Sequence, residues 1–189
     1  MSEQRMSSEA SGREAVSLDD LDFWSFVELA NRRLSTEFGS THQLATEVLL
    51  SLNRAANVVT YDLEATVHRP HGLSFPTFRL MFVIWLTGPI EPKNAARLTG
   101  MSRAAVSNLS KSLQSAGLLE REPDPDDRRS VRLLLTPAGQ EKISEIYRDH
   151  NEREQAWASG LTEAEQRVLV LLLDKLITNR EQMGVRGRN

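Results

Sequence analysis

Apolar residues recur at helical spacing along most of the chain. Between residues 41 and 67 they return every three or four positions, which predicts an amphipathic helix of about seven turns. The capping box Ser40-Thr-His-Gln43 opens this helix, and the breaker Arg69-Pro-His-Gly72 ends it. A shorter helix is predicted over 18–38, opened by Ser17-Leu-Asp-Asp20 and ended by Gly39.

Three later segments are also predicted to be helical. The segment 74–87 is apolar nearly all round, which indicates a central and buried helix. Thr136-Pro137 opens a helix that runs to about residue 158, and Thr162-Glu-Ala-Glu165 opens a last helix to about residue 183. Because 168–173 is apolar on every side, this last helix needs a cover, and a second copy of the chain is the economical one.

The middle of the chain predicts two helices joined by a tight turn. Residues 91–100 form the first helix, with Pro92 near its start, and Gly100-Met101 forms the turn. Ser102 is suited to cap the second helix, which extends over 102–116. A short helix, a turn containing glycine and a second helix together form a helix-turn-helix.

The outer face of the predicted 102–116 helix carries no carboxylate. Its cations and short polar groups are of the types that contact phosphates and base edges. They are Arg103, Ser107, Asn108, Lys111 and Gln114. Alone, such a face is equally typical of a solvated surface helix, so its interpretation depends on the elements beside it.

A β-hairpin is predicted directly after the helix-turn-helix. Residues 118–122 and 131–135 have strand patterns, and the turn 123–130 between them is highly charged. Alone, this tip would be interpreted as a solvated turn; after a helix-turn-helix it is a wing suited to the DNA backbone or minor groove. The predicted fold is mainly α with a small β-hairpin wing: a winged helix-turn-helix plus a helical dimerisation region.

The composition is that of a globular protein with extensions. Its 189 residues are 40% hydrophobic and 26% charged, and the absence of cysteine excludes disulfides and thiolate metal sites. The polar start of the chain is not a signal peptide, and no apolar run approaches the roughly 20 residues of a membrane span. We therefore expect a cytoplasmic protein with no cofactor and no membrane contact.

Charge is distributed unevenly around a formal net charge of −3. Residues 1–40 carry eight acids and four bases, whereas residues 92–117 carry no acid. The bases of that second stretch are Lys93, Arg97, Arg103 and Lys111. Because phosphate contacts are local, this basic stretch can bind double-stranded DNA in spite of the acidic total.

Six segments together resemble the MarR family of bacterial transcription regulators, in the family's order and spacing over about residues 41–183. They are Leu73-Ser-Phe-Pro-Thr-Phe-Arg-Leu80, Ala95-Ala-Arg-Leu98, Met101-Ser-Arg-Ala-Ala-Val-Ser107, Leu113-Gln-Ser-Ala-Gly-Leu-Leu-Glu-Arg121, Asp124-Pro-Asp-Asp-Arg-Arg-Ser130 and Leu135-Thr-Pro-Ala-Gly139. The wing signature Asp126-Asp-Arg-Arg-Ser130, followed by Leu-Thr-Pro-x-Gly, is the most specific piece. The resemblance implies a homodimeric winged helix-turn-helix protein, usually a repressor on a palindromic operator, which a small aromatic molecule commonly releases.

The resemblance also implies the DNA contacts. In the helix-turn-helix they are Ser102, Arg103, Ser107, Asn108 and Lys111, and in the wing they are Arg128 and Arg129. We expect Lys93 of the basic stretch and Ser130 of the wing signature to contact DNA as well. Asp126 or Asp127 is expected to pair with a wing arginine and hold the wing, because an unpaired carboxylate there would repel phosphate. Arg132, on the second strand, can face either way.

The expected organisation has four parts. Residues 1–17 form a disordered tail, 18–39 an extra N-terminal helix at the dimer contact, 40–71 and 138–183 the dimerisation helices, and 72–137 the DNA-binding domain. The extra helix departs from the commonest family pattern. The absence of cysteine argues against the family's thiol-oxidation branch.

A ligand cavity is expected between the dimerisation helices and the winged domain, lined from 41–67 and 74–87. The candidate pocket residues are His71, Arg79, Met81 and Trp85. Met81 and Trp85 are also explained by a simple core position, and the sequence favours that position over a pocket role.

Two other classes of function stay open on the sequence. An enzyme is disfavoured because the chain has no Gly-rich phosphate loop and no recognisable nucleophile or zinc motif. His68 and His71 have a spacing that suits a metal, but Pro70 lies between them, so we expect solvated histidines at a helix end and no metal. A winged helix that binds protein is the second alternative, and the acid-free face of 102–116 argues against it.

Overall fold

The computed structural model describes residues 22–39, 42–125 and 130–184. The chain divides into two compact units, Met1–Ala56 and Asn57–Asn189, and each is described by itself. The predicted tail and the two capping boxes at 17–20 and 40–43 lie wholly or partly outside the described residues. None of the described helices is long and apolar enough to cross a membrane.

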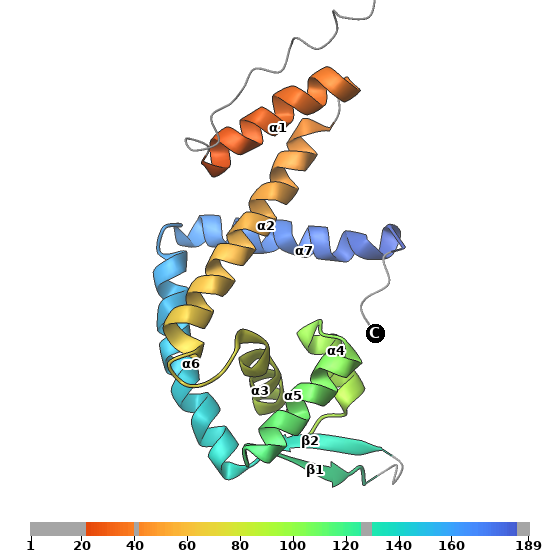
Figure 1. The fold of residues 1–189 in the computed structure, drawn as a ribbon, viewed down its shortest axis with the longest axis vertical. Helices are drawn as coiled ribbons and strands as arrows, with labels where there is room; N and C mark the ends of the chain where they lie inside the picture. The colour runs from red at the N-terminus through yellow and green to blue at the C-terminus, as the bar shows by residue number, and fades with distance from the viewer. Residues whose placement is uncertain (1–21, 40–41, 126–129, 185–189) are drawn as a thin grey trace, which may run out of the picture. The chain divides into compact units, whose positions relative to one another are not determined.

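The elements follow the predicted order (Figure 1). They are α1 (Phe23–Phe38), α2 (Gln43–Leu63), the π-helical turn η2 (Glu64–His68), α3 (Phe75–Thr87), α4 (Pro92–Thr99), α5 (Arg103–Ser115), β1 (Leu119–Pro123), β2 (Val131–Leu135), α6 (Pro137–Ala158) and α7 (Glu163–Gln182). The prediction of a mainly helical chain with one small hairpin is confirmed.

In the first unit, α1 begins at Phe23. Asp22 has extended backbone, and its carboxylate accepts a hydrogen bond of 2.7 Å from the Ser25 N–H, so Asp22 is the N-cap of α1, and the predicted start near residue 18 lies outside the described residues. Val27 is buried, and the Arg54 guanidinium of α2 lies 5.8 Å from the centre of the Phe23 ring. These contacts pack α1 on the first half of α2.

In the second unit, α3 is the centre of a winged-helix core. Phe78, Leu80, Met81 and Ile84 are buried, which confirms the predicted central helix, although Leu86 is 63% exposed. Side chains from every neighbouring element pack in the same cluster. They are Ala95 and Ala96 of α4, Val106 and Leu113 of α5, Leu119 of β1, Leu133 of β2, and Ile143 and Ile146 of α6.

The wing is an antiparallel hairpin in which Leu119 pairs with Leu135 and Pro123 pairs with Val131. Ile90, in the turn after α3, adds a bridge to Leu133 through two backbone hydrogen bonds of 2.8 and 3.0 Å. The base of the wing is therefore anchored to the core.

Polar contacts fasten the end of α2 to α6. Asp62 accepts hydrogen bonds of 2.6 Å from both Nε and Nη2 of Arg153 and one of 2.7 Å from Trp157 Nε1, which lower the pKa of Asp62 to about 2. Six residues after Asp62, the Nε2 atom of His68 lies 3.1 Å from Nδ1 of His150. These contacts join α2 and η2 to α6, although the paired residues are far apart in sequence.

The prediction that His68 is a solvated histidine at a helix end is wrong. His68 has no exposed surface, and its ring stacks on Phe78 at 4.4 Å. His71 is separate from it and binds the Asp149 carboxylate at 2.8 Å. No group of three or more metal-ligating side chains occurs within the part of the chain that the structure describes.

Gly139, in the first turn of α6, touches the segment that precedes β1. A Cβ at this position would lie 2.0 Å from the Leu118 carbonyl oxygen. Gly139→Ala is therefore expected to destabilise the fold by about 1–3 kcal/mol through overpacking, although a glycine-to-alanine change at a compatible helical position stabilises by about 0.4–1 kcal/mol. Urea unfolding measures this difference. Ala138→Gly at the exposed neighbour is the control, expected to cost about 1 kcal/mol or less; a Gly139→Ala protein as stable as wild type would contradict the packing.

The buried histidine pair makes stability depend on pH. Burial lowers the pKa of His68 to about 4, with a further contribution from His150, whose own pKa burial also lowers. The pKa of His68 in the folded protein lies below the value of about 6.5 in the unfolded chain. The stability that the neutral His68 contributes is therefore complete above about pH 6.5 and is lost as pH falls toward 4. His68 should account for about 2 kcal/mol of the loss in unfolding free energy between pH 7.5 and 5.

Replacing His68 tests this dependence. His68→Phe keeps a ring on Phe78 and should lose less stability than wild type between pH 7.5 and 5, because one of the two buried histidines is removed. His42→Gln, at an exposed position, is the control and should behave as wild type. Equal losses in His68→Phe and wild type, measured by urea unfolding at the two pH values, would show that His68 does not carry the effect.

Candidate DNA-binding interface

Helices α4 and α5 form the predicted helix-turn-helix, with the hairpin of β1 and β2 beside them (Figure 1). Gly100 ends α4 in the left-handed conformation with φ of 69°. Ser102 then caps α5, and its hydroxyl accepts a hydrogen bond of 3.1 Å from the Ala105 N–H. Glycine and serine thus set the short turn that orients α5.

Packing against α3 determines which face of α5 points outward. Val106 and Leu113 are buried, as is Ser110, whose hydroxyl donates to the Val106 carbonyl oxygen at 2.7 Å. Leu109 is half-buried. The opposite face is therefore free for a partner.

Most predicted contacts of α5 lie on this outer face. Ser102, Arg103, Asn108 and Lys111 are exposed, and Ser107 is half-buried at its edge. Within the described residues, no ion pair involves Arg103 or Lys111, so both charges are available to an anionic partner. Further residues of α5 are exposed, although the sequence interpretation had not selected them as contacts. They are Ala104, Ser112 and Ser115.

Lys93 and the predicted wing residues differ in their surroundings from the contacts on α5. Lys93, at the start of α4, is paired with Glu91 at 2.6 Å, which offsets part of its charge. Ser130 is half-buried at the end of the wing. The predicted contacts Arg128 and Arg129 and the predicted wing-holding Asp126 and Asp127 lie outside the described residues.

A wing-holding ion pair does occur, on residues that the sequence interpretation missed. Arg132 of β2 faces across the hairpin to β1, where its Nη2 atom lies 2.9 Å from Glu122 Oε1. Its Nε atom lies 3.8 Å from Asp124 Oδ2. The cross-strand register, which places Glu122 opposite Arg132, is the signal that would have found the pair.

A cavity of about 490 Å³ lies beside α3. Its walls come from the end of α2, α3, α4 and α6, and include Phe75, Phe78, Phe82, Tyr147 and His150. Arg79 is the one of the four candidate pocket residues that lines it. Met81 is fully buried in the core, and His71 binds Asp149 outside it.

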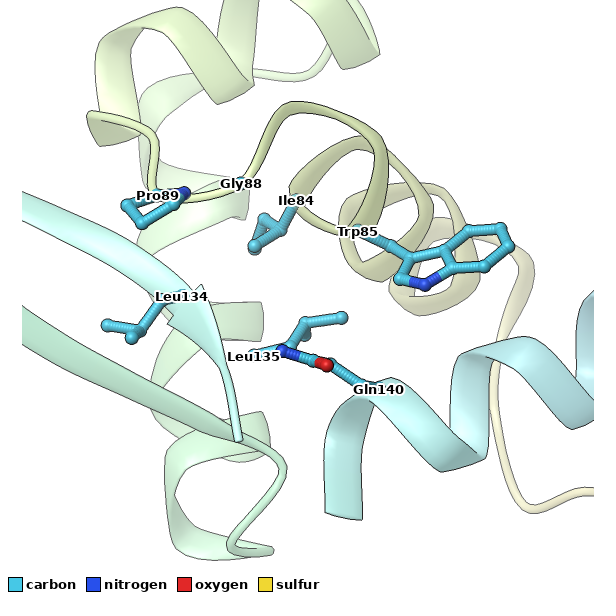
Figure 2. Close-up of a pocket in the computed structure, with 7 residues that line it drawn as sticks. All are labelled: Ile84, Trp85, Gly88, Pro89, Leu134, Leu135 and Gln140. Atoms are coloured by element: carbon cyan, nitrogen blue, oxygen red, sulfur yellow. The ribbon is translucent and has the colours of Figure 1, made fainter. Parts of the chain in front are cut away.

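Trp85 lines a second, smaller cavity of about 240 Å³. Figure 2 shows that its lining residues come from α3, the turn after it, β2 and the start of α6. The ring centre of Trp85 also lies 5.6 Å from that of Tyr147, which lines the larger cavity. The predicted single pocket is thus divided between two cavities and the core.

Comparisons with known proteins agree with this geometry. The MarR family model matches residues 71–130. The chain is 30% identical over 135 residues to the uncharacterized HTH-type transcriptional regulator YwaE of Bacillus subtilis, covering 71% of this chain and 79% of that protein. It is 26% identical over 136 residues to the HTH-type transcriptional regulator MgrA of Staphylococcus aureus, covering 72% and 91%.

The solved structures give the same result. BpsR of Bordetella bronchiseptica, whose DNA binding is regulated by 6-hydroxynicotinic acid, matches with a TM-score of 0.63 and 26% identity. That match covers 69% of this chain and 98% of the other. A probable transcriptional regulator from Pseudomonas aeruginosa matches with the same TM-score, covering 70% and 98%. The chain therefore belongs to the MarR family of winged-helix, DNA-binding transcriptional regulators and is not an enzyme.

Proposed function

We propose that the protein is a homodimeric repressor that places two copies of α5 in successive major grooves of a palindromic operator. The observation that carries this proposal is the outer face of α5, where Arg103, Asn108 and Lys111 are exposed and no carboxylate occurs. In winged-helix proteins the second helix of the helix-turn-helix enters the major groove. Two copies about 10 bp apart would give the operator its two-fold symmetry.

The hydrophobic surface of α7 supports the homodimer. Leu169, Val170, Leu171 and Leu172 are all at least 44% exposed in the single chain, and Ile177 is 59% exposed. A continuous apolar surface of this kind is typical of an interface. Trp24 and Phe38 expose a similar surface on α1, which we assign to a further dimer contact.

The larger cavity supports release by a small aromatic molecule. Its aromatic walls suit a flat apolar body, and Arg79 supplies a cation. The relative BpsR, regulated by 6-hydroxynicotinic acid, provides a precedent at 26% identity. An effector of this class would release DNA by binding more tightly to the conformation that cannot hold both half-sites.

DNA binding to the region upstream of the protein's own gene tests the proposal. Lys111→Gln should weaken binding and reduce the slope of log K against log salt by about 1.8, because the dimer loses one phosphate contact from each of its two copies. Asn108→Ala should leave the slope unchanged and relax the preference for one base by about 1–3 kcal/mol. Fluorescence anisotropy over a salt series and a panel of base substitutions measures both effects.

Arg148→Gln is the control for this series, since Arg148 is an exposed cation of α6, outside the helix-turn-helix and the wing. It should bind as wild type. An unchanged salt slope in Lys111→Gln would refute its phosphate contact. No binding by the wild-type protein, even at low salt, would overturn the repressor proposal itself.

The dimer has its own test. Leu172→Glu should convert the protein to monomers, because association would bury a charge on each copy. Light scattering after size-exclusion chromatography measures the mass. Asn179→Glu, also on an exposed position of α7, is the control and should remain dimeric; a monomeric wild type would contradict the proposed assembly.

A further inference from the structure

Arg79 of α3 holds the end of the first helix of the helix-turn-helix. Its Nη2 atom donates a hydrogen bond to the carbonyl oxygen of Thr99, the last residue of α4. The same Nη2 atom lies 3.8 Å from where a Cβ on Gly100 would be, which places the guanidinium at the turn itself. A cation at this position also suits the negative end of the helix dipole.

The turn that Arg79 contacts positions α5. Thr99 is buried, and its hydroxyl donates to the Ala95 carbonyl at 2.7 Å and accepts from the Met101 N–H at 3.3 Å. Ser102, the N-cap of α5, follows directly. Because α4 has only eight residues and the turn is short, a shift of the Thr99 carbonyl moves the start of α5.

The same guanidinium lines the larger cavity. It lies 5.6 Å from the centre of the Phe75 ring, on a wall of the cavity. Glu154, an acid of the cavity, is held by His150 at 3.0 Å and by Asn151 at 3.5 Å. Among the described residues no carboxylate forms an ion pair with Arg79.

We infer that Arg79 exchanges partners: it binds the Thr99 carbonyl when the larger cavity is empty and an anionic occupant when the cavity is filled. Both contacts are charge-assisted because the guanidinium is ionised, but an anion adds the attraction of opposite charges and therefore binds Arg79 more strongly than the neutral carbonyl does. The end of α4 then loses its cap, and α5 leaves the orientation that fits DNA. This inference rests on the proposed DNA-binding role of α5 and states how an anion in the cavity would regulate that role.

A carboxylate built into the cavity tests the exchange without any ligand. Val83 lines the cavity four residues after Arg79, which puts the two side chains one turn apart on the same face of α3. Val83→Glu supplies an anion to Arg79, and Val83→Gln is the matched uncharged control. Both are also prepared with Arg79→Gln, which completes a double-mutant cycle.

Operator affinity is the first measurement. Val83→Glu should bind about tenfold more weakly than Val83→Gln when Arg79 is present, and the two should bind equally when Arg79 is replaced. Equal affinities with Arg79 present would overturn the inference. A difference that persists with Arg79→Gln would also overturn it, because the added charge would then act on DNA directly. If Val83→Glu does not fold, Leu98→Glu and Leu98→Gln serve instead, since Leu98 lines the cavity and is 48% exposed.

Amide hydrogen exchange over residues 99–106 is the second measurement, and it needs no DNA. The Glu variant should exchange about threefold faster than the Gln variant in this segment, and only with Arg79 present. Equal exchange would overturn the inference on its own. Failure of wild-type protein to bind DNA would instead defeat the repressor proposal, while the exchange data would still decide the role of Arg79.

Discussion

Burial of α3 is the constraint on which the DNA-binding half of the molecule depends. Phe78, Leu80, Met81 and Ile84 are removed from water by side chains of α4, α5, the wing and α6. Each of these elements packs an apolar face against α3. The polar face of α5 must therefore point outward to solvent. The exposure of Arg103 and Lys111 follows from the packing of Val106 and Leu113 on the other side of α5.

The elements with strong local signals could be predicted from the sequence. Thr136 caps its helix as expected and Ser74 caps α3 in the same way, each accepting a hydrogen bond from the backbone N–H three residues later, because capping is decided within four residues of chain. The capping box at Thr162 and Glu165 forms for the same reason. The acid-free face of α5 was equally visible, since helical periodicity alone separates it from Val106 and Leu113.

Contacts between distant segments were not predictable in this way. His68 and His150 are 82 positions apart, and no local pattern indicates that their rings meet. The predicted pocket residues do not line one cavity, for a geometric reason that the sequence did contain: at 100° per residue, Met81 and Trp85 lie about 200° and 240° around α3 from Arg79. They could not share its face, whereas Phe82 and Val83 could, and both line the larger cavity.

Arg79 is the single polar side chain between Phe78 and Leu86, and the same burial of α3 explains its position. Arg79 remains exposed to solvent although its guanidinium donates to the Thr99 carbonyl. The Thr99 carbonyl provides one acceptor but carries no charge, so it compensates the cation only in part. The incomplete compensation leaves the cation available to a stronger partner in the cavity, and the contact that would be given up is the one at the turn before α5. Two acceptors, the Thr99 carbonyl and an anion in the cavity, would compete for the one guanidinium of Arg79. This competition is enough to couple the cavity to α5, so the coupling needs no separate hinge.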